Sequence, residues 1–103
     1  ECDTVHAWHT VFERVLKQMR GRARARQYVM TLHAEEEMSD DDLTILDVEE
    51  SILTGEIIEG QKDAETGEWK YLVKGQSAAG DEIVVVTKIS FTGKLVLITV
   101  YRL

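Results

Sequence analysis

Apolar residues recur at steps of three and four in the first quarter of the chain, which is the spacing of one face of a helix. The pattern predicts an amphipathic helix from Val5 to about Arg24, interrupted or ended at Gly21. Its apolar face is expected to lie in the core, or against a second copy of the chain in a homodimer. The residues of this face are Val5, Trp8, Val11, Phe12, Val15, Leu16 and Met19.

A short strand and a short helix are predicted next. Residues 27–32 alternate Tyr28, Met30 and Leu32 with two β-branched residues, which is typical of a strand. Strong helix formers from residue 33 to residue 38 then predict a short helix, and the aspartates at 40–42 supply the turn that ends it.

A third helix is predicted from Leu43 to Leu53 by its capping residues. Thr44 is followed three residues later by Asp47, which is the spacing of an N-terminal capping box. Gly55 is expected to end this helix with a positive φ, a conformation that glycine adopts without a steric penalty.

Beyond residue 55 the apolar period changes from 3.6 to 2, which predicts strands joined by short turns. Both faces of the last two strands are partly apolar, so these strands are expected to be central and covered by helices. The sequence thus predicts an α+β fold with an N-terminal amphipathic helix, a short strand, two helices and a four-strand antiparallel meander. The four strands are Glu56–Glu59, Glu68–Lys74, Glu82–Ile89 and Leu95–Arg102.

Length and composition limit the classes of protein to consider. The chain has 103 residues, 44% of them hydrophobic and 30% charged, as expected for one globular domain. Its apolar runs are shorter than the ~20 residues of a membrane-spanning helix, so no membrane partner is expected. With Cys2 as its only cysteine it cannot form an internal disulfide, which favours a reducing, cytoplasmic location.

Charge is distributed unevenly along the chain, although the net charge is −7. Between His33 and Glu68 there are 14 acids and one base, Lys62. The first 26 residues instead form a predicted basic arm, separate from an α+β domain at 27–103, that contacts phosphates or an acidic protein surface. A solvated helix face is the alternative. The basic residues of the arm are Arg14, Lys17, Arg20, Arg22, Arg24 and Arg26.

Several side chains could support acid–base chemistry without a metal ion, which needs a base, an acid and a cation. His33 titrates near neutral pH, and Glu37 lies four residues later on the same helical face, where it could orient the imidazole. The alternative is that His33 is satisfied by local backbone and that the strand cations are solvated. Candidate cations and rings on the strands are Lys70, Lys88, Arg102, Tyr71 and Tyr101.

Metal ligation is a weaker hypothesis. Cys2, His6 and His9 are close in sequence, and Glu35, Glu36 and the aspartates at 40–42 offer oxygen ligands. Acidic runs of this kind usually mark solvated turns, so no metal and no cofactor are expected.

Several sequence runs carry a family resemblance: HAEEEM at 33–38, LTGEIIE at 53–59, EWKYLVKG at 68–75, VVVTKIS at 84–90 and TGKLVLITVYR at 92–102. Together they make the chain from Tyr28 onward, about three quarters of its length, resemble a bacterial family known as domain of unknown function 4258. The resemblance implies an α+β fold similar to ribonuclease toxins of the RelE and BrnT kind, with an antitoxin protein as partner. Glu37 stands where the family usually has arginine.

Two functions are therefore expected as alternatives. The first is a toxin-like, metal-independent endoribonuclease of a toxin–antitoxin system. In it His33 is acid or base, Glu37 orients it, Lys70 or Arg102 stabilises charge, and Tyr101 offers a hydroxyl or a stacking ring. The second is a catalytically inactive binding domain that docks a partner protein or RNA through its basic arm.

Overall fold

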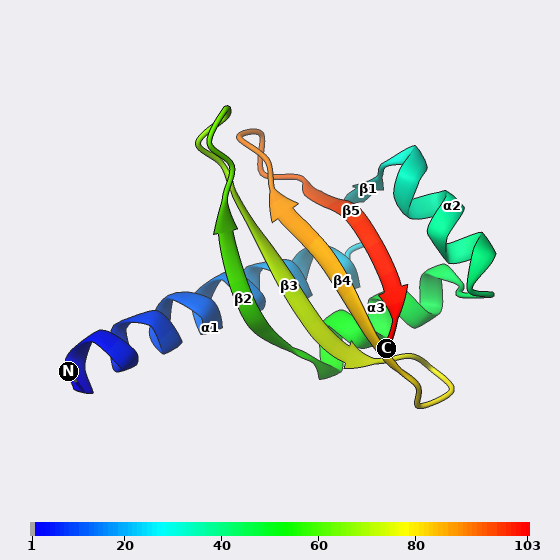
Figure 1. The fold of residues 1–103 in the computed structure, drawn as a ribbon, viewed down its shortest axis with the longest axis horizontal. Coiled ribbons are helices and arrows are strands. Elements are labelled where there is room, and N and C mark those ends of the chain that lie inside the picture. The colour runs from blue at the N-terminus through cyan, green and yellow to red at the C-terminus, as the bar shows by residue number, and fades with distance from the viewer. Residues whose placement is uncertain (1) are drawn as a thin grey trace.

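The structure of the chain is a computed structural model that describes the backbone of residues 2–103 and the side chains of residues 11–103. Its mixed α+β architecture confirms the predicted fold class and order of elements (Figure 1). The elements are α1 (Cys2–Arg24), β1 (Tyr28–Met30), α2 (Leu32–Asp40), α3 (Ile45–Thr54), β2 (Glu56–Lys62), β3 (Trp69–Gln76), β4 (Glu82–Ile89) and β5 (Leu95–Arg102).

The strands form one five-stranded sheet in the order β1-β5-β4-β3-β2. Strands β2 to β5 are the expected antiparallel meander, but the prediction of a four-strand sheet is wrong, because β1 pairs in parallel with β5. A meander leaves the outer backbone groups of its last strand unpaired. Residues 28–30 satisfy part of that edge, with Tyr28 opposite Leu95 and Met30 opposite Leu97.

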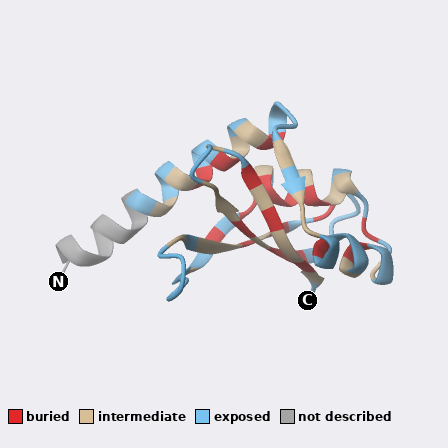
Figure 2. Ribbon diagram, turned by 90° about the horizontal axis from the view of Figure 1, so that it is seen from above, coloured by how far each residue is buried: buried red, intermediate tan, exposed pale blue. Residues whose placement is uncertain are grey.

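Helices cover one face of this sheet. In Figure 1, α1 and α3 lie behind the sheet and α2 lies beside its β1–β5 edge. Met19 of α1, Ile52 of α3 and Val85 of β4 are at most 1% exposed and belong to one core. In Figure 2, buried positions follow the strands and the helix surfaces that meet them.

The expectation that helices cover both faces of β4 and β5 is wrong. Val84 is 1% exposed, yet it lies on the face opposite the core cluster. Its cross-strand neighbours there are Lys74 and Tyr101. Side chains of the sheet itself, rather than a helix, therefore bury Val84.

Several elements begin or end at residues other than those predicted. α1 continues through Gly21 to Arg24, so Gly21 does not interrupt it. The first strand ends at Met30 because the Thr31 side chain accepts a hydrogen bond from the Ala34 N–H and caps α2. Leu32 is therefore the first residue of α2 and is 69% exposed.

The capping box of α3 is confirmed, but the expected role of Gly55 is wrong. The Thr44 side chain accepts from the Asp47 N–H, and the Asp47 carboxylate accepts from the Thr44 N–H. Gly55 has an extended backbone with φ −91°, so positive φ is not its function. A Cβ at Gly55 would lie 2.5 Å from the carbonyl oxygen of Lys74, and glycine therefore permits the close contact between α3 and β3.

Candidate functional site

Two lysines lie side by side on the sheet face that α1 and α3 leave uncovered. Tyr71 of β3 pairs with Thr87 of β4, which brings the adjacent residues Lys70 and Lys88 opposite each other. Lys88 in turn pairs with Val96 of β5. Directly opposed side chains of neighbouring strands are about 5 Å apart at Cβ, so two like charges meet here.

These lysines line a cleft of about 280 Å³, which we call the lysine cleft. Its floor is formed by Val96 and Ile98 of β5, and Thr31 closes it at the α2 end. Thr31 is fixed there because its hydroxyl donates to the carbonyl oxygen of Ile98 at 2.9 Å. The remaining lining residues are Asp63, Thr66 and Glu68.

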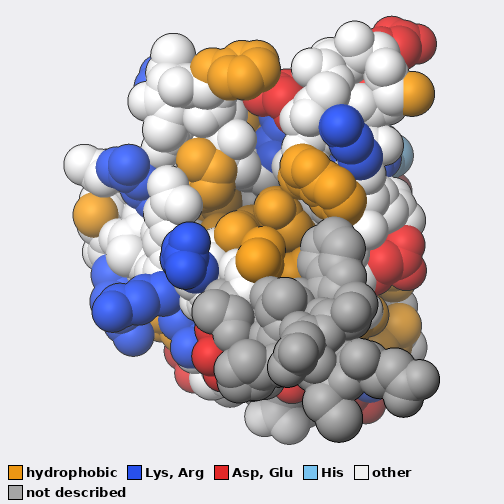
Figure 3. Space-filling model, turned by 90° about the vertical axis from the view of Figure 1, so that its left-hand side faces the viewer, with side chains coloured by type: hydrophobic (Ala, Val, Ile, Leu, Met, Phe, Trp, Pro, Cys, Tyr) orange, Lys and Arg blue, Asp and Glu red, His pale blue; other side chains and the backbone are white. Residues whose placement is uncertain are grey.

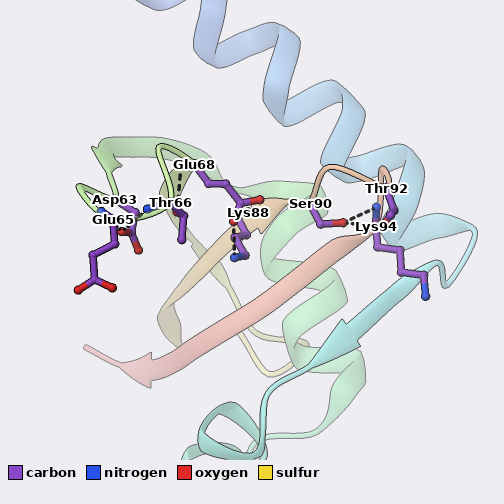
Figure 4. Close-up of polar contacts among 8 residues, drawn as sticks. All are labelled: Asp63, Glu65, Thr66, Glu68, Lys88, Ser90, Thr92 and Lys94. Atoms are coloured by element: carbon purple, nitrogen blue, oxygen red, sulfur yellow. Dashed lines mark hydrogen bonds and ion pairs between the residues drawn. The ribbon is translucent and has the colours of Figure 1, made fainter.

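The loop between β2 and β3 has a fixed shape, which holds one wall of the cleft (Figure 4). The Asp63 carboxylate accepts from the backbone N–H groups of Glu65 and Thr66 at 2.8 and 3.2 Å. Gly67 has φ +75°, which favours glycine in this turn. The N–H groups of Thr66 and Glu65 lower the pKa of Asp63, and the charges of Lys70 and Lys88 lower it further.

Glu68 neutralises one of the two lysines. Its carboxylate lies 2.9 Å from the Lys88 ammonium, and the two side chains are 14% and 29% exposed (Figure 4). Lys70 has no ion pair among the side chains that the structure describes. The cleft therefore contains two ammonium groups and two carboxylates, and the Lys70 ammonium, which has no ion pair with a described side chain, is the group that can bind an anion.

His33 and Glu37 are brought together as predicted, with 3.2 Å between the His33 Nε2 and Glu37 Oε1 atoms. Glu37 also has a structural role, because Oε1 accepts from the Val100 N–H at 3.1 Å. It thus satisfies the edge of β5 beyond the end of β1. The His33 side chain is 65% exposed and does not line the lysine cleft, although Thr31, two residues earlier, does.

Arg102 and Tyr101 lie toward the other end of β5. The Arg102 guanidinium donates to the Asp81 carboxylate at 2.8 Å and to the carbonyl oxygen of Asp41 at 2.6 Å. Arg102 is six residues beyond Val96, which corresponds to about 20 Å along a strand. Tyr101 is half-buried opposite Val84. The predicted set of five catalytic residues is therefore divided among Lys70 in the cleft, the His33–Glu37 pair near its edge, and these two distal side chains.

Residues 30–102 match the family model of a domain of unknown function, DUF4258. The chain belongs to this family. The match agrees with the extent of the resemblance seen in the sequence, and the family description assigns no activity. No curated protein and no solved structure matches the chain.

The DUF4258 match begins after α1, so the basic residues of α1 lie outside the family region. Arg14, Lys17 and Arg24 are exposed. Arg20, also predicted to bind RNA, is engaged within the fold, because its guanidinium donates to the carbonyl oxygens of Ile52 and Gly55 at 3.1 and 2.7 Å. Arg20 therefore caps the C-terminal end of α3.

Arg22 and Arg26 turn toward a different surface. The Arg22 guanidinium donates to the Gln27 side-chain oxygen at 3.0 Å, and Arg26 lies 3.8 Å from the Glu49 carboxylate. Glu49 also accepts from the Tyr28 hydroxyl, and burial together with this contact raises the pKa of Tyr28 to about 12. The basic residues of the predicted arm thus face several directions, from α1 and from the turn that follows it.

Sequence reasoning did not select Glu68, Thr31 or Lys94 as site residues. Strand alternation alone could have placed Lys70 and Lys88 on one face, but only after the pairing of β3 with β4 was known. The alternating pattern of residues 27–32 predicts a strand at Thr31, whereas Thr31 is the N-cap of α2.

The metal hypothesis involving Cys2, His6 and His9 concerns side chains outside the described residues. Among the described side chains, Glu35, Glu36 and the aspartates at 40–42 included, no group of three potential ligands is placed to hold a metal ion. Within the described part of the chain, the helices are also too short or too polar to cross a membrane.

Proposed function

We propose that this protein is a toxin-like endoribonuclease that cleaves RNA without a metal ion, with the scissile phosphate in the lysine cleft. One observation carries the proposal: Lys70 and Lys88 are adjacent on an uncovered sheet face, and of the two only Lys88 is held in an ion pair with a described side chain, Glu68. The RelE-like and BrnT-like resemblance of the sequence supports the same class of reaction. An antitoxin protein is the expected partner in such a system.

The proposed reaction is attack of a ribose 2′-oxygen on the adjacent phosphorus. Glu68 accepts the proton of the 2′-hydroxyl, and the ammonium groups of Lys70 and Lys88 stabilise the negative charge of the pentacoordinate phosphorus. The bond from phosphorus to the 5′-oxygen then breaks, and His33, oriented by Glu37, donates a proton to that oxygen. The products are a 2′,3′-cyclic phosphate and a 5′-hydroxyl.

This proposal is tested with purified protein and a labelled RNA in the presence of EDTA. Lys70→Ala and Glu68→Gln should each lower the rate about 100-fold or more, as expected when a charge-stabilising or proton-transfer group is lost. Lys62→Ala is the matched control, because Lys62 is exposed and does not line the cleft. It is opposite Trp69 in the β2–β3 pair, so its side chain lies on the other face of the sheet from Lys70. Equal cleavage by Lys70→Ala and the wild type would reject the cleft as the active site.

His33 is tested separately, because it does not line the cleft. His33→Ala should lower the rate and remove the alkaline limb of the pH profile, since His33 acts as the acid. A rate and profile unchanged by His33→Ala would remove this residue from the mechanism while leaving the cleft lysines in place.

A catalytically inactive binding domain is the second candidate, favoured by an exposed apolar pocket. Phe91 is 90% exposed, Trp69 37% and Val11 42%. Trp69 and Phe91 line a pocket of about 290 Å³ beside α1, and Figure 3 shows hydrophobic side chains gathered on this side of the molecule. Such a surface suits a partner protein. RNA binding without any cleavage, together with loss of partner binding in Phe91→Ser, would favour this function.

A further inference from the structure

A positively charged pocket lies at the β1 edge of the sheet. It has a volume of about 390 Å³ and lies between the C-terminal end of α1, the start of β1 and the β4–β5 turn. Arg22, Arg26 and Lys94 all line it, together with the Gln27 amide and Val29. We call it the basic pocket. Its three cations come from two segments about 70 residues apart in sequence.

The cations of the basic pocket outnumber the nearby acids. Arg22 is held by its hydrogen bond to Gln27, and its Nη2 atom is 3.2 Å from the position that a Cβ at Gly93 would occupy. Lys94 is exposed and has no ion pair among the described side chains. The acid that contacts this group is Glu49, at 3.8 Å from Arg26. Two of the three positive charges are therefore not neutralised by an ion pair.

Arg26 occupies a backbone position that usually belongs to glycine. The Gln27 N–H donates to the Arg22 carbonyl and the Arg26 N–H to the Ala23 carbonyl, which is the Schellman pattern at the end of a helix. Arg26 itself has φ 56°, a left-handed conformation that is unfavourable for a residue with a Cβ atom. Residues with a Cβ atom in this conformation are often found at functional sites.

The basic pocket adjoins the lysine cleft across two paired strands. Val29 lines the basic pocket, Val96 lines the cleft, and the two residues are opposite each other in β1 and β5. Lys88 is the next residue in the same row, on β4. Neighbouring strands are about 4.8 Å apart, so the backbones at Lys88 and Val29 are separated by about 10 Å. One extended nucleic-acid strand can span that distance.

We propose that the basic pocket binds a second phosphate of the same single-stranded RNA, adjacent to the phosphate held in the lysine cleft. This inference rests on the proposed function for the identity of its ligand. Arginine guanidinium groups bind phosphate oxygens in pairs of hydrogen bonds, and Lys94 adds a point charge. The pocket would thus set the position of the strand while the cleft holds the reacting group.

The test measures binding of the whole chain to an eight-nucleotide 2′-O-methyl RNA, which cannot be cleaved, as a function of salt. Arg22→Gln, Lys94→Gln and Arg26→Gly should each weaken binding about 3- to 10-fold. Each should also reduce the slope of log K against log[salt] by about 0.7, the value for one lost phosphate contact on a single strand. Lys62→Gln is the matched control, because Lys62 is exposed and lines neither the basic pocket nor the lysine cleft.

Arg26→Gly separates binding from folding, because glycine relieves the left-handed backbone. Its melting temperature should equal or exceed that of the wild type while its affinity falls. Unchanged affinity and salt slope in all three variants would overturn the proposal. The proposal would also be overturned if inorganic phosphate bound to the pocket while the three substitutions left RNA affinity unchanged. The ligand would then be a free anion.

The fate of this proposal can be distinguished from that of the ribonuclease proposal. If no RNA is cleaved but the three variants bind RNA more weakly, the basic pocket stands and the catalytic assignment falls. If Lys70→Ala abolishes cleavage while the three variants bind as the wild type does, the cleft stands and the basic pocket falls.

Discussion

Gly75 in β3 and Gly55 before β2 allow α3 to approach the sheet more closely than other residues would permit. A Cβ at Gly75 would lie 2.1 Å from the carbonyl oxygen of Ser51, and Ser51 is itself fully buried. Because the obstructing atoms belong to the backbone, they cannot turn aside as a side chain can. The requirement for glycine here is steric and does not come from the backbone angles.

We therefore expect Gly75→Ala to lower the free energy of unfolding by about 2–4 kcal/mol, through displacement of α3. Gly21→Ala is the control, because Gly21 lies within α1 and a Cβ there would meet no atom within 4 Å. It should raise the free energy of unfolding by about 0.5–1 kcal/mol. Urea denaturation of both variants measures the difference, and equal stability of the two would contradict the steric argument.

Asp47, at the start of α3, makes the stability of the fold depend on pH. The Thr44 N–H lowers the pKa of its carboxyl group, and the Ala78 N–H and the charge of Arg102 lower it further. Because the pKa is lower in the folded than in the unfolded chain, ionised Asp47 stabilises the fold above the usual aspartate pKa of about 3.9. That contribution is lost as the pH falls through the folded value.

Asp47→Asn should accordingly be less stable than the wild type at pH 7, and the difference should shrink as the pH is lowered below about 4. Thermal unfolding from pH 7 to pH 2.5 measures it. Asp42→Asn is a suitable control, because Asp42 is exposed and caps no helix. A constant difference between Asp47→Asn and the wild type over this range would show that Asp47 acts only as a neutral cap.

At the scale of elements, the sequence pattern located each helix and strand, and errors fell at their ends. β4 and β5 were predicted with their observed bounds because their apolar alternation is long and uninterrupted. The bounds of the short elements were predicted less well. Thr31, for example, is compatible with a strand because its side chain is β-branched, and with a helix cap because it has a hydroxyl group. Hydrogen bonding to β5 decides between these two roles.

Arg20 of α1 connects this helix to the C-terminal end of α3. Arg20→Ala should lower the free energy of unfolding by about 1–3 kcal/mol, because it leaves the partly buried carbonyls of Ile52 and Gly55 without their charged donor. Arg14→Ala, an exposed arginine of the same helix, should change it by no more than about 0.5 kcal/mol. Equal effects of the two substitutions on urea denaturation would assign Arg20 to the surface.

At the scale of the whole molecule, α1 is part of the core although the family match excludes it. Leu16, Met19 and Ala23 are buried in the same cluster as α3 and the sheet. The described part of α1 thus closes the back of the sheet as well as carrying basic residues. Folding of the family region and placement of the basic pocket therefore depend on one helix.

A chain limited to residues 27–103 should consequently lose its cooperative thermal transition, because the sheet and α3 would expose the surface that α1 covers. Met19→Ala in the full chain removes only part of this packing. It should lower the free energy of unfolding by about 2–5 kcal/mol. Calorimetry of both proteins is the measurement. A two-state transition of 27–103 at the temperature of the full chain would show that α1 is an independent arm.

The candidate site could be predicted only in part. The His33–Glu37 contact follows from helical spacing, and it is present. The grouping of Lys70 with Lys88, and the separation of Arg102 from both, depend on strand register. The contacts of Arg20 and Arg26 likewise involve residues more than 20 positions away. Pattern along the chain contains no information about such partners.

The sequence by itself determined the α+β class, the order of elements, the capping of α3 and the family, because these depend on local periodicity and on short motifs. Only the tertiary structure decided that β1 joins β5, that helices leave one sheet face uncovered, and that the lysine cleft and the basic pocket lie next to each other. The physical reason is that pairing of distant strands and packing of helices are set by contacts between segments remote in sequence.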